Sequence, residues 1–174
     1  MPKITLASLI LVTLFTLNMS TICAQETVVS ASGALRGPKQ ESEFDYRVVE
    51  LRRFLEKFNS PLSIYAEDFV RYADMYGIDY RLVPAITGVE STFGKRIPYL
   101  SYNAYGWANG SYKFTSWRHS ISHVTMKLKY DYMNKGATTI PKIARIYAPP
   151  STTWGRNVSS FVRKISMLPV SYDI

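Results

Sequence analysis

One carboxylate stands within an apolar and small-residue stretch of the sequence, GVESTFG at residues 88–94. The apolar residues around it recur at helical spacing, at Leu82, Ile86, Val89 and Phe93. Glu90 lies one position off this stripe, so its carboxyl is expected at the edge of the core. Partial burial raises a carboxyl pKa, which suits a group that donates a proton near neutral pH. The alternative is a solvated surface charge, as lone helical glutamates usually are.

Aromatic residues follow in the segment KRIPYLSYNAYGWANGSYKF, residues 95–114. Tyrosine and tryptophan combine an apolar face, which stacks on a sugar ring, with a polar atom that binds its hydroxyls. We expect Tyr102, Tyr105 and Trp107 to face a cleft because an irregular segment exposes them. The alternative is packing in a core or hairpin, and Trp154 is assigned to the core.

Two histidines lie four residues apart, at His119 and His123, a spacing that can hold a metal ion. There is no glutamate between them in the zinc-protease pattern and no third ligand near them in the sequence. We therefore expect a surface pair, no metal site and no cofactor.

The chain of 174 residues is long enough for one domain with a real core. Residues 1–24 have a basic start, an apolar run and a small polar end, which predicts a cleaved signal peptide and an exported protein. The apolar run is shorter than the roughly 20 residues that span a bilayer, so a membrane is a partner only if this segment is retained. Residues 25–42 are predicted as a flexible linker and 43–174 as the domain. We expect a monomer, and cleavage would remove the single cysteine, Cys23, which excludes disulfide and thiolate chemistry.

Charge is distributed unevenly along the chain. Residues 25–90 carry 8 basic and 11 acidic side chains, a net charge of −3. Residues 91–174 carry 12 basic and only two acidic ones, a net charge of +10. A cationic surface on an exported protein favours an anionic cell-wall polymer over nucleic acid as its partner, and no recognisable nucleic-acid motif is present.

The fold is predicted to be mainly α, with about six helices. Helical patterns begin near Val48, and later ones cover 116–135, 140–147 and 152–167. Asn109-Gly110 between alternating aromatic residues predicts a small β-hairpin near residues 105–114.

The segment IDYRLVPAITGVESTFGKRIPYLSYNAYGW, residues 78–107, resembles the mannosyl-glycoprotein endo-β-N-acetylglucosaminidase-like domain of bacterial cell-wall hydrolases, within the lysozyme-like superfamily. The family pattern is a helix that ends in Glu-Ser with a glycine soon after, followed by Asn-x-aromatic-Gly and a later Tyr-Ala. Here these are Glu90, Ser91, Gly94, the segment 103–106, and 147–148. The match spans about residues 65–166.

The resemblance implies a lysozyme-like α+β fold and cleavage of the β-1,4 glycosidic bond between amino sugars of peptidoglycan. Glu90 would be the general acid, and Ser91 would orient it or contact the substrate. The remaining substrate-binding side chains implied are those of Tyr102, Asn103, Tyr105, Trp107 and Tyr147.

Carboxylates are scarce beyond Glu90, where only Asp131 and Asp173 follow. Retaining and inverting glycosidases need two carboxylates about 5 to 10 Å apart. The sequence therefore favours a single-carboxylate mechanism, in which the substrate's own N-acetyl group or a hydroxyl replaces the second residue. A lytic transglycosylase and a non-catalytic wall-binding module are the alternatives.

Overall fold

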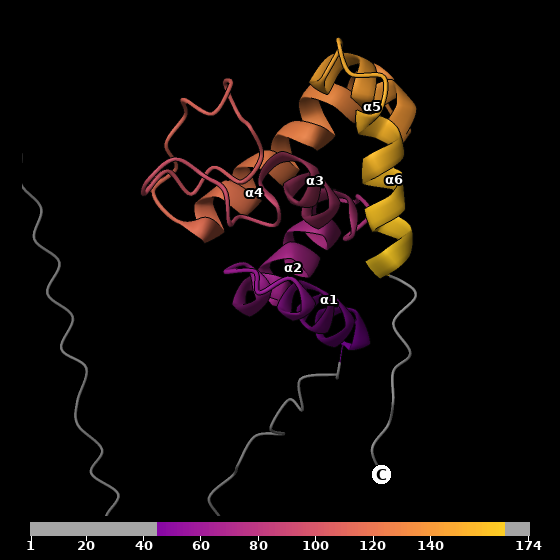
Figure 1. The fold of residues 1–174 in the computed structure, drawn as a ribbon. Helices are drawn as coiled ribbons and strands as arrows, with labels where there is room; N and C mark the ends of the chain where they lie inside the picture. Colours follow the sequence, from indigo (N-terminus) through magenta and orange to yellow (C-terminus); the bar gives the residue numbers. More distant parts are fainter. Residues whose placement is uncertain (1–44, 166–174) are drawn as a thin grey trace, which may run out of the picture. The chain divides into compact units, whose positions relative to one another are not determined.

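The computed structural model describes residues 45–165 (Figure 1). The predicted signal peptide at 1–24 and linker at 25–42 lie outside the described residues. So do the first two and the last nine residues of the predicted domain.

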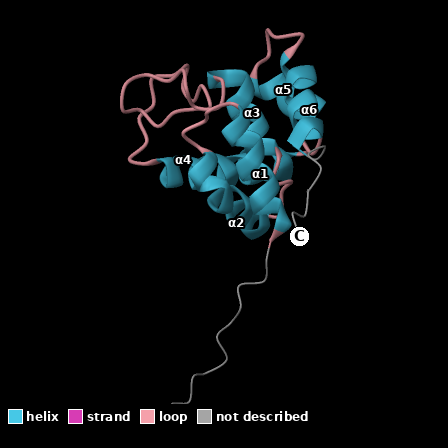
Figure 2. Ribbon diagram, turned by 60° about the horizontal axis from the view of Figure 1, so that its bottom comes forward, coloured by secondary structure: helices cyan, strands magenta, loops and turns pink. Residues whose placement is uncertain are grey.

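The described residues form six α-helices joined by loops and short helical turns, and they contain no strand (Figure 2). This confirms the mainly α prediction. The helices are α1 (Tyr46–Lys57), α2 (Ala66–Tyr76), α3 (Leu82–Ser91), α4 (Trp117–Lys127), α5 (Ile140–Tyr147) and α6 (Trp154–Ile165), and the short turns are η1 (Ser63–Tyr65), η2 (Leu128–Tyr132) and η3 (Met133–Lys135).

Helix α3 is the central helix of the fold. Six consecutive residues from Leu82 to Thr87 are buried, so the helix is covered on all sides over this part, as expected of a helix that is apolar all round. It packs against α6, while α2 packs against α4 and α1, and α5 packs against α6 (Figure 1). Helix α3 is therefore fixed by the packing of its neighbours.

Glycines end several helices where the sequence predicts an end. Gly77 closes α2 in the left-handed conformation, with φ of 61°. Gly136, with φ of 94°, follows the predicted helix 116–135. That helix is not uniform, because α4 passes into the π-helical turn η2 and then the 3₁₀ turn η3. Ser116 caps its start by accepting a hydrogen bond from the backbone N–H of His119.

The predicted β-hairpin near residues 105–114 is wrong. Asn109 and Gly110 adopt the positive φ of a tight turn, but no strand forms on either side of it. The reason is the side chain of Asn103, whose amide nitrogen donates to the carbonyl oxygens of Trp107 and Tyr112 at 2.9 and 3.0 Å. A side chain thus binds backbone groups that a strand ladder would have paired.

None of the helices in the described part of the chain is both long and apolar enough to span a membrane.

Candidate active site

The Glu90 carboxylate lies in the last turn of α3, between the start of α6 and the loop at Gly106. Its Oε1 accepts a hydrogen bond of 2.7 Å from the indole Nε1 of Trp154. Its Oε2 faces Gly106 so closely that a Cβ added to this glycine would lie 2.6 Å from the oxygen. Gly106 also has a φ of 65°, so both its backbone conformation and its lack of a side chain are needed here.

Partial burial sets the protonation of Glu90. Its pKa is raised above the ordinary value of 4.5 because removal from water disfavours the charged carboxylate. The hydrogen bond from Trp154 acts in the opposite direction, since it stabilises the carboxylate, but burial is the larger effect. This agrees with the expected position at the edge of the core, and such a carboxyl can serve as a proton donor.

The backbone turns sharply directly after Glu90 and Ser91. Thr92, Phe93 and Gly94 have φ of 53°, 58° and 81° in succession, a conformation that a β-branched threonine rarely adopts. The buried hydroxyl of Ser91 stabilises this turn by accepting a hydrogen bond from the Gly94 N–H at 2.9 Å. Backbone strain of this kind is typical of functional sites.

Ser91 also connects the helix to the loop that faces Glu90. Its Oγ lies 2.8 Å from the carbonyl oxygen of Ala104 and 3.0 Å from that of Thr87. Because Ser91 is only 3% exposed, it is not open to a substrate. Two roles were predicted for Ser91, to orient Glu90 or to contact the substrate, and the geometry fits the first.

A cluster of phenylalanines fixes the same end of α3. The Phe93 ring lies between Phe58 and Phe161, with ring centroids at 4.3 and 4.9 Å. This packing needs Gly88, because a Cβ there would lie 2.6 Å from Cε1 of Phe93 and 3.0 Å from Cδ2 of Phe161. The two glycines of GVESTFG thus permit close packing and a sharp turn on either side of Glu90.

Asn103 organises the loop instead of facing a cleft. It is 3% exposed, and its Oδ1 accepts from the backbone N–H groups of Trp107 at 3.0 Å and Tyr105 at 3.4 Å. Both ends of its amide are therefore used within the protein, and it has no free group for a substrate in this arrangement.

A pocket of about 240 Å³ lies between the loop at Gly106 and the aromatic residues at the ends of η2 and α5. Its lining residues are Tyr105, Gly106, Trp107, Ala108, Asn109, Tyr132 and Tyr147. The pocket thus brings together two of the predicted binding side chains, Trp107 and Tyr147. Glu90 is not one of its lining residues, and the carboxyl group adjoins this aromatic pocket through Gly106, which its Oε2 faces.

Tyr147, at the end of α5, connects the loop at Tyr105 with the start of α6 at Trp154. Its hydroxyl donates to the carbonyl oxygen of Tyr105 at 2.6 Å, and its ring stacks on Trp154 with a centroid distance of 4.9 Å. Its pKa is raised by burial and, to a smaller degree, by the charge of Glu90, so it stays protonated and keeps donating to the loop.

The side chains of two predicted cleft residues do not face the pocket. The side chain of Tyr105 is fully buried, and only its backbone contributes to the site through the bond from Tyr147. Tyr102 packs edge to face on Trp117 at 5.4 Å and does not line the pocket. The segment is irregular as expected, but Asn103 folds it back on the core, where Tyr105 is buried and Tyr102 is half-buried.

The residues that line this pocket include no carboxylate. Asp131, the acid that follows Glu90 in the sequence, lies near two lysines, at 2.9 Å from Lys127 and 3.9 Å from Lys135. Asp68 on α2 pairs with Arg71 and Arg118. Within the described residues, no group of three or more His, Cys, Asp and Glu side chains is placed to hold a metal ion.

Only one histidine of the predicted surface pair is exposed. His119 is exposed, whereas His123 is partly buried against Trp107, Tyr112 and Phe114. Burial is the main cause of the lowered pKa of His123, so the ring favours its neutral form within this aromatic cluster.

Two site residues, Trp154 and Tyr132, were not predicted from the sequence, and Gly106 belonged to the family pattern but was given no role at Glu90. Trp154 was assigned to the core, and it is 4% exposed, but its N–H points at Glu90. A buried indole N–H usually needs a hydrogen-bond acceptor, and this requirement could have indicated a polar partner for Trp154. Tyr132 reaches the pocket through the π turn η2, which no sequence pattern indicated.

No model of a known protein family matches the chain, and a comparison with curated proteins gives no match either.

Proposed function

We propose that this chain is an exported peptidoglycan hydrolase that cleaves β-1,4 glycosidic bonds between amino sugars, with Glu90 as the general acid. The observation that supports it best is the environment of one carboxyl group. Glu90 is partly buried, its pKa is raised, and it is held between an indole N–H and a side-chain-free glycine beside an aromatic pocket.

In this mechanism Glu90 protonates the oxygen of the scissile bond. Trp154 and Gly106 hold the carboxyl in one orientation, and a positioned acid of this kind contributes about 10²- to 10⁴-fold to a rate. The rings of Trp107, Tyr132 and Tyr147 stack on sugar faces and exclude water from one side of the bond. Export is part of the proposal and depends on the N-terminal sequence.

The second half of the reaction uses the substrate itself. Since no carboxylate lines the pocket, the N-acetyl oxygen of the substrate attacks the anomeric carbon while the glycosidic C–O bond breaks and its oxygen takes the proton of Glu90. Water then adds to the anomeric carbon, gives a proton back to Glu90 and opens the ring that the N-acetyl group had formed. The product is a new reducing N-acetylglucosamine end. The same shortage favours a second candidate, a lytic transglycosylase, in which the 6-hydroxyl of muramic acid attacks and leaves a 1,6-anhydro end.

Mass spectrometry of the fragments released from purified sacculi distinguishes the two reactions. A reducing N-acetylglucosamine end supports the hydrolase, whereas a 1,6-anhydro muramic end supports the transglycosylase. A protein that binds sacculi and releases no fragment is a non-catalytic binding module, and this result would overturn the proposal.

A further inference from the structure

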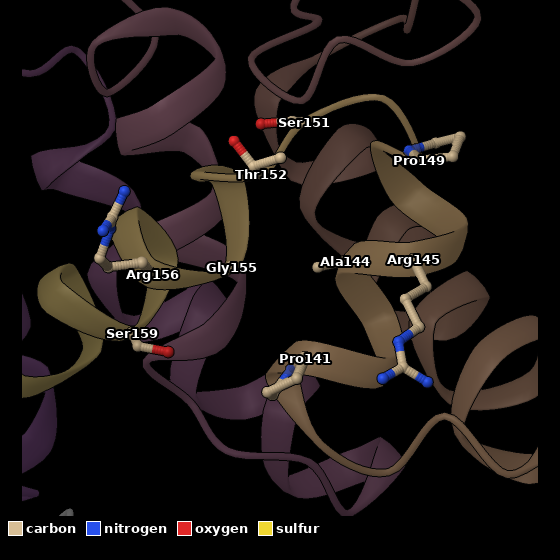
Figure 3. A pocket seen from close by; sticks show the side chains of 9 residues that line it. All are labelled: Pro141, Ala144, Arg145, Pro149, Ser151, Thr152, Gly155, Arg156 and Ser159. Atoms are coloured by element: carbon tan, nitrogen blue, oxygen red, sulfur yellow. The ribbon is translucent and has the colours of Figure 1, made fainter.

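A second hollow lies between helices α5 and α6 (Figure 3). It has a volume of about 400 Å³, and it is bordered by Pro149, Ser151 and Thr152 of the connecting loop. We call it the α5–α6 groove. None of its lining residues belongs to the pocket beside Glu90, so it is a separate site.

The groove is cationic on both sides. Arg145 on α5 and Arg156 on α6 line it from opposite sides (Figure 3). Neither arginine forms an ion pair within residues 45–165, whereas Arg47, Arg71, Arg81 and Arg118 all do. There is no acidic residue between 138 and 165, although this segment holds five basic ones. Two guanidinium groups are thus available for carboxylates from outside, which they bind in a bidentate manner.

The floor of the groove is small and apolar. Ala144 and Gly155 face each other across it, and a Cβ added to Gly155 would lie 3.2 Å from Cβ of Ala144 (Figure 3). Pro141 closes one end, and the hydroxyls of Thr152 and Ser159 lie around the space. A narrow apolar floor with hydroxyls at its edges suits a short peptide with small side chains, because hydroxyls bind peptide groups.

The groove and Glu90 are connected through the start of α6. Trp154, which donates to Glu90, directly precedes Gly155 and Arg156 of the groove. Its backbone N–H also donates to Ser151 Oγ at 3.1 Å, so the loop that borders the groove is fixed by the same residue. A substituent on a strand bound at Glu90 therefore has a binding surface nearby.

We propose that the α5–α6 groove binds the short acidic peptide attached to the amino-sugar strand, with Arg145 and Arg156 binding its carboxylates. This inference rests on the proposed function, because it takes peptidoglycan as the substrate. A compact phosphate is a poorer fit, since the two arginines lie on opposite sides instead of converging on one point (Figure 3).

Cleavage kinetics on two substrates test the groove. The substrates are glycan strands that carry their peptides and the same strands stripped of peptide by an amidase. We expect KM to be about tenfold lower for the peptide-bearing strands, from two charge pairs of about threefold each. The double variant Arg145→Gln/Arg156→Gln should raise KM on peptide-bearing strands to the stripped-strand value and leave KM on stripped strands unchanged.

The matched control is Lys142→Gln/Arg163→Gln. It removes the same charge from the same two helices, and both side chains are exposed outside the groove. It should behave as the unmodified protein does. Equal KM values of the unmodified protein for the two substrates would show that the groove binds no peptide. An equal rise in KM in the control variant would show a general effect of charge. Either result would overturn the inference.

A binding measurement makes the test independent of cleavage. Calorimetry on the full-length Glu90→Gln chain would use a soluble N-acetylmuramyl peptide with free carboxylates, the same peptide as carboxamides, and a glycerol phosphate polymer. Binding of the carboxylate form alone, lost in the arginine double variant, supports the groove even if no variant cleaves a strand, in which case only the proposed hydrolase fails. Equal binding of the carboxamide, or tighter arginine-dependent binding of the phosphate polymer, would overturn the peptide assignment.

Discussion

The indole nitrogen of Trp154 donates a 2.7 Å hydrogen bond to Glu90, a residue 64 positions earlier in the chain. This bond joins the first turn of α6 to the last turn of α3. It has two effects on the carboxyl group: it fixes the orientation, and it lowers a pKa that burial has raised. Replacement of Trp154 should therefore change both the rate and its pH dependence.

Trp154→Phe keeps an aromatic ring against Tyr147 and removes the N–H donor. A general acid must be protonated, so activity falls as pH rises through the pKa of Glu90. Because the bond from Trp154 lowers this pKa, its loss should move the alkaline limb of the pH profile to higher pH and reduce kcat. The control is Trp117→Phe, which packs on Tyr102 outside the pocket. An unmoved alkaline limb in Trp154→Phe would contradict this role.

Gly106→Ala places a methyl group 2.6 Å from Glu90 Oε2, so the carboxyl must shift. A displacement of about 1 Å at a catalytic group costs about 100-fold in rate. The matched control is Gly110→Ala, where φ is also positive, at 82°, but no atom lies within 4 Å of the added Cβ.

Both glycine variants should lose about 1 kcal/mol of stability from the unfavourable φ, measured by denaturant unfolding. Only Gly106→Ala should also lose catalytic activity, because only there does the added methyl group displace Glu90. Equal activity in the two variants would show that the contact with Glu90 has no catalytic importance.

Asn103→Ala tests whether this residue binds substrate or organises the loop. Its amide bonds to backbone groups of Tyr105, Trp107 and Tyr112, which would be left without partners. We expect the free energy of unfolding to fall by about 2–4 kcal/mol. Hydrogen exchange of the loop should become faster at the same time. Asn157→Ala, at an exposed position of α6, should change stability by less than about 0.5 kcal/mol. A raised KM with unchanged stability would instead indicate direct substrate contact by Asn103.

Glu90→Gln should make the fold more stable at pH 7. The folded pKa of Glu90 is raised, so the folded state holds this proton more tightly than the unfolded state does. Stability is therefore lost as pH rises from the unfolded value of 4.5 through the folded pKa, and glutamine removes this loss.

Thermal unfolding across the pH range measures whether Glu90→Gln raises or lowers stability. The variant should exceed the unmodified protein in Tm at neutral pH, and the difference should shrink near pH 3, where both side chains are uncharged. A lower Tm of the variant at pH 7 would show that burial does not disfavour the charged form of Glu90.

Helical periodicity was enough to predict the helix that carries Glu90. The stripe through Leu82, Ile86 and Val89 placed Glu90 at the edge of the core, because a helix fixes the angle between neighbouring residues. The glycines after α2 and η3 marked helix ends for the same local reason.

Periodicity could not predict how the loop folds or where buried polar atoms point. The Asn109-Gly110 turn formed as the local sequence requires, but Asn103 took the backbone partners that a hairpin needs. The stripe that includes Trp154 predicted a buried ring and said nothing of its N–H. Such contacts depend on residues far apart in the sequence, so they need the assembled fold.

The most direct test of the central claim compares the mature protein with its Glu90→Gln variant on purified sacculi, with cleavage followed by released fragments and binding by pull-down. The account predicts that the variant loses cleavage by at least about 100-fold and still binds sacculi as the unmodified protein does. Cleavage that persists in the variant would contradict the assignment of Glu90 as the general acid.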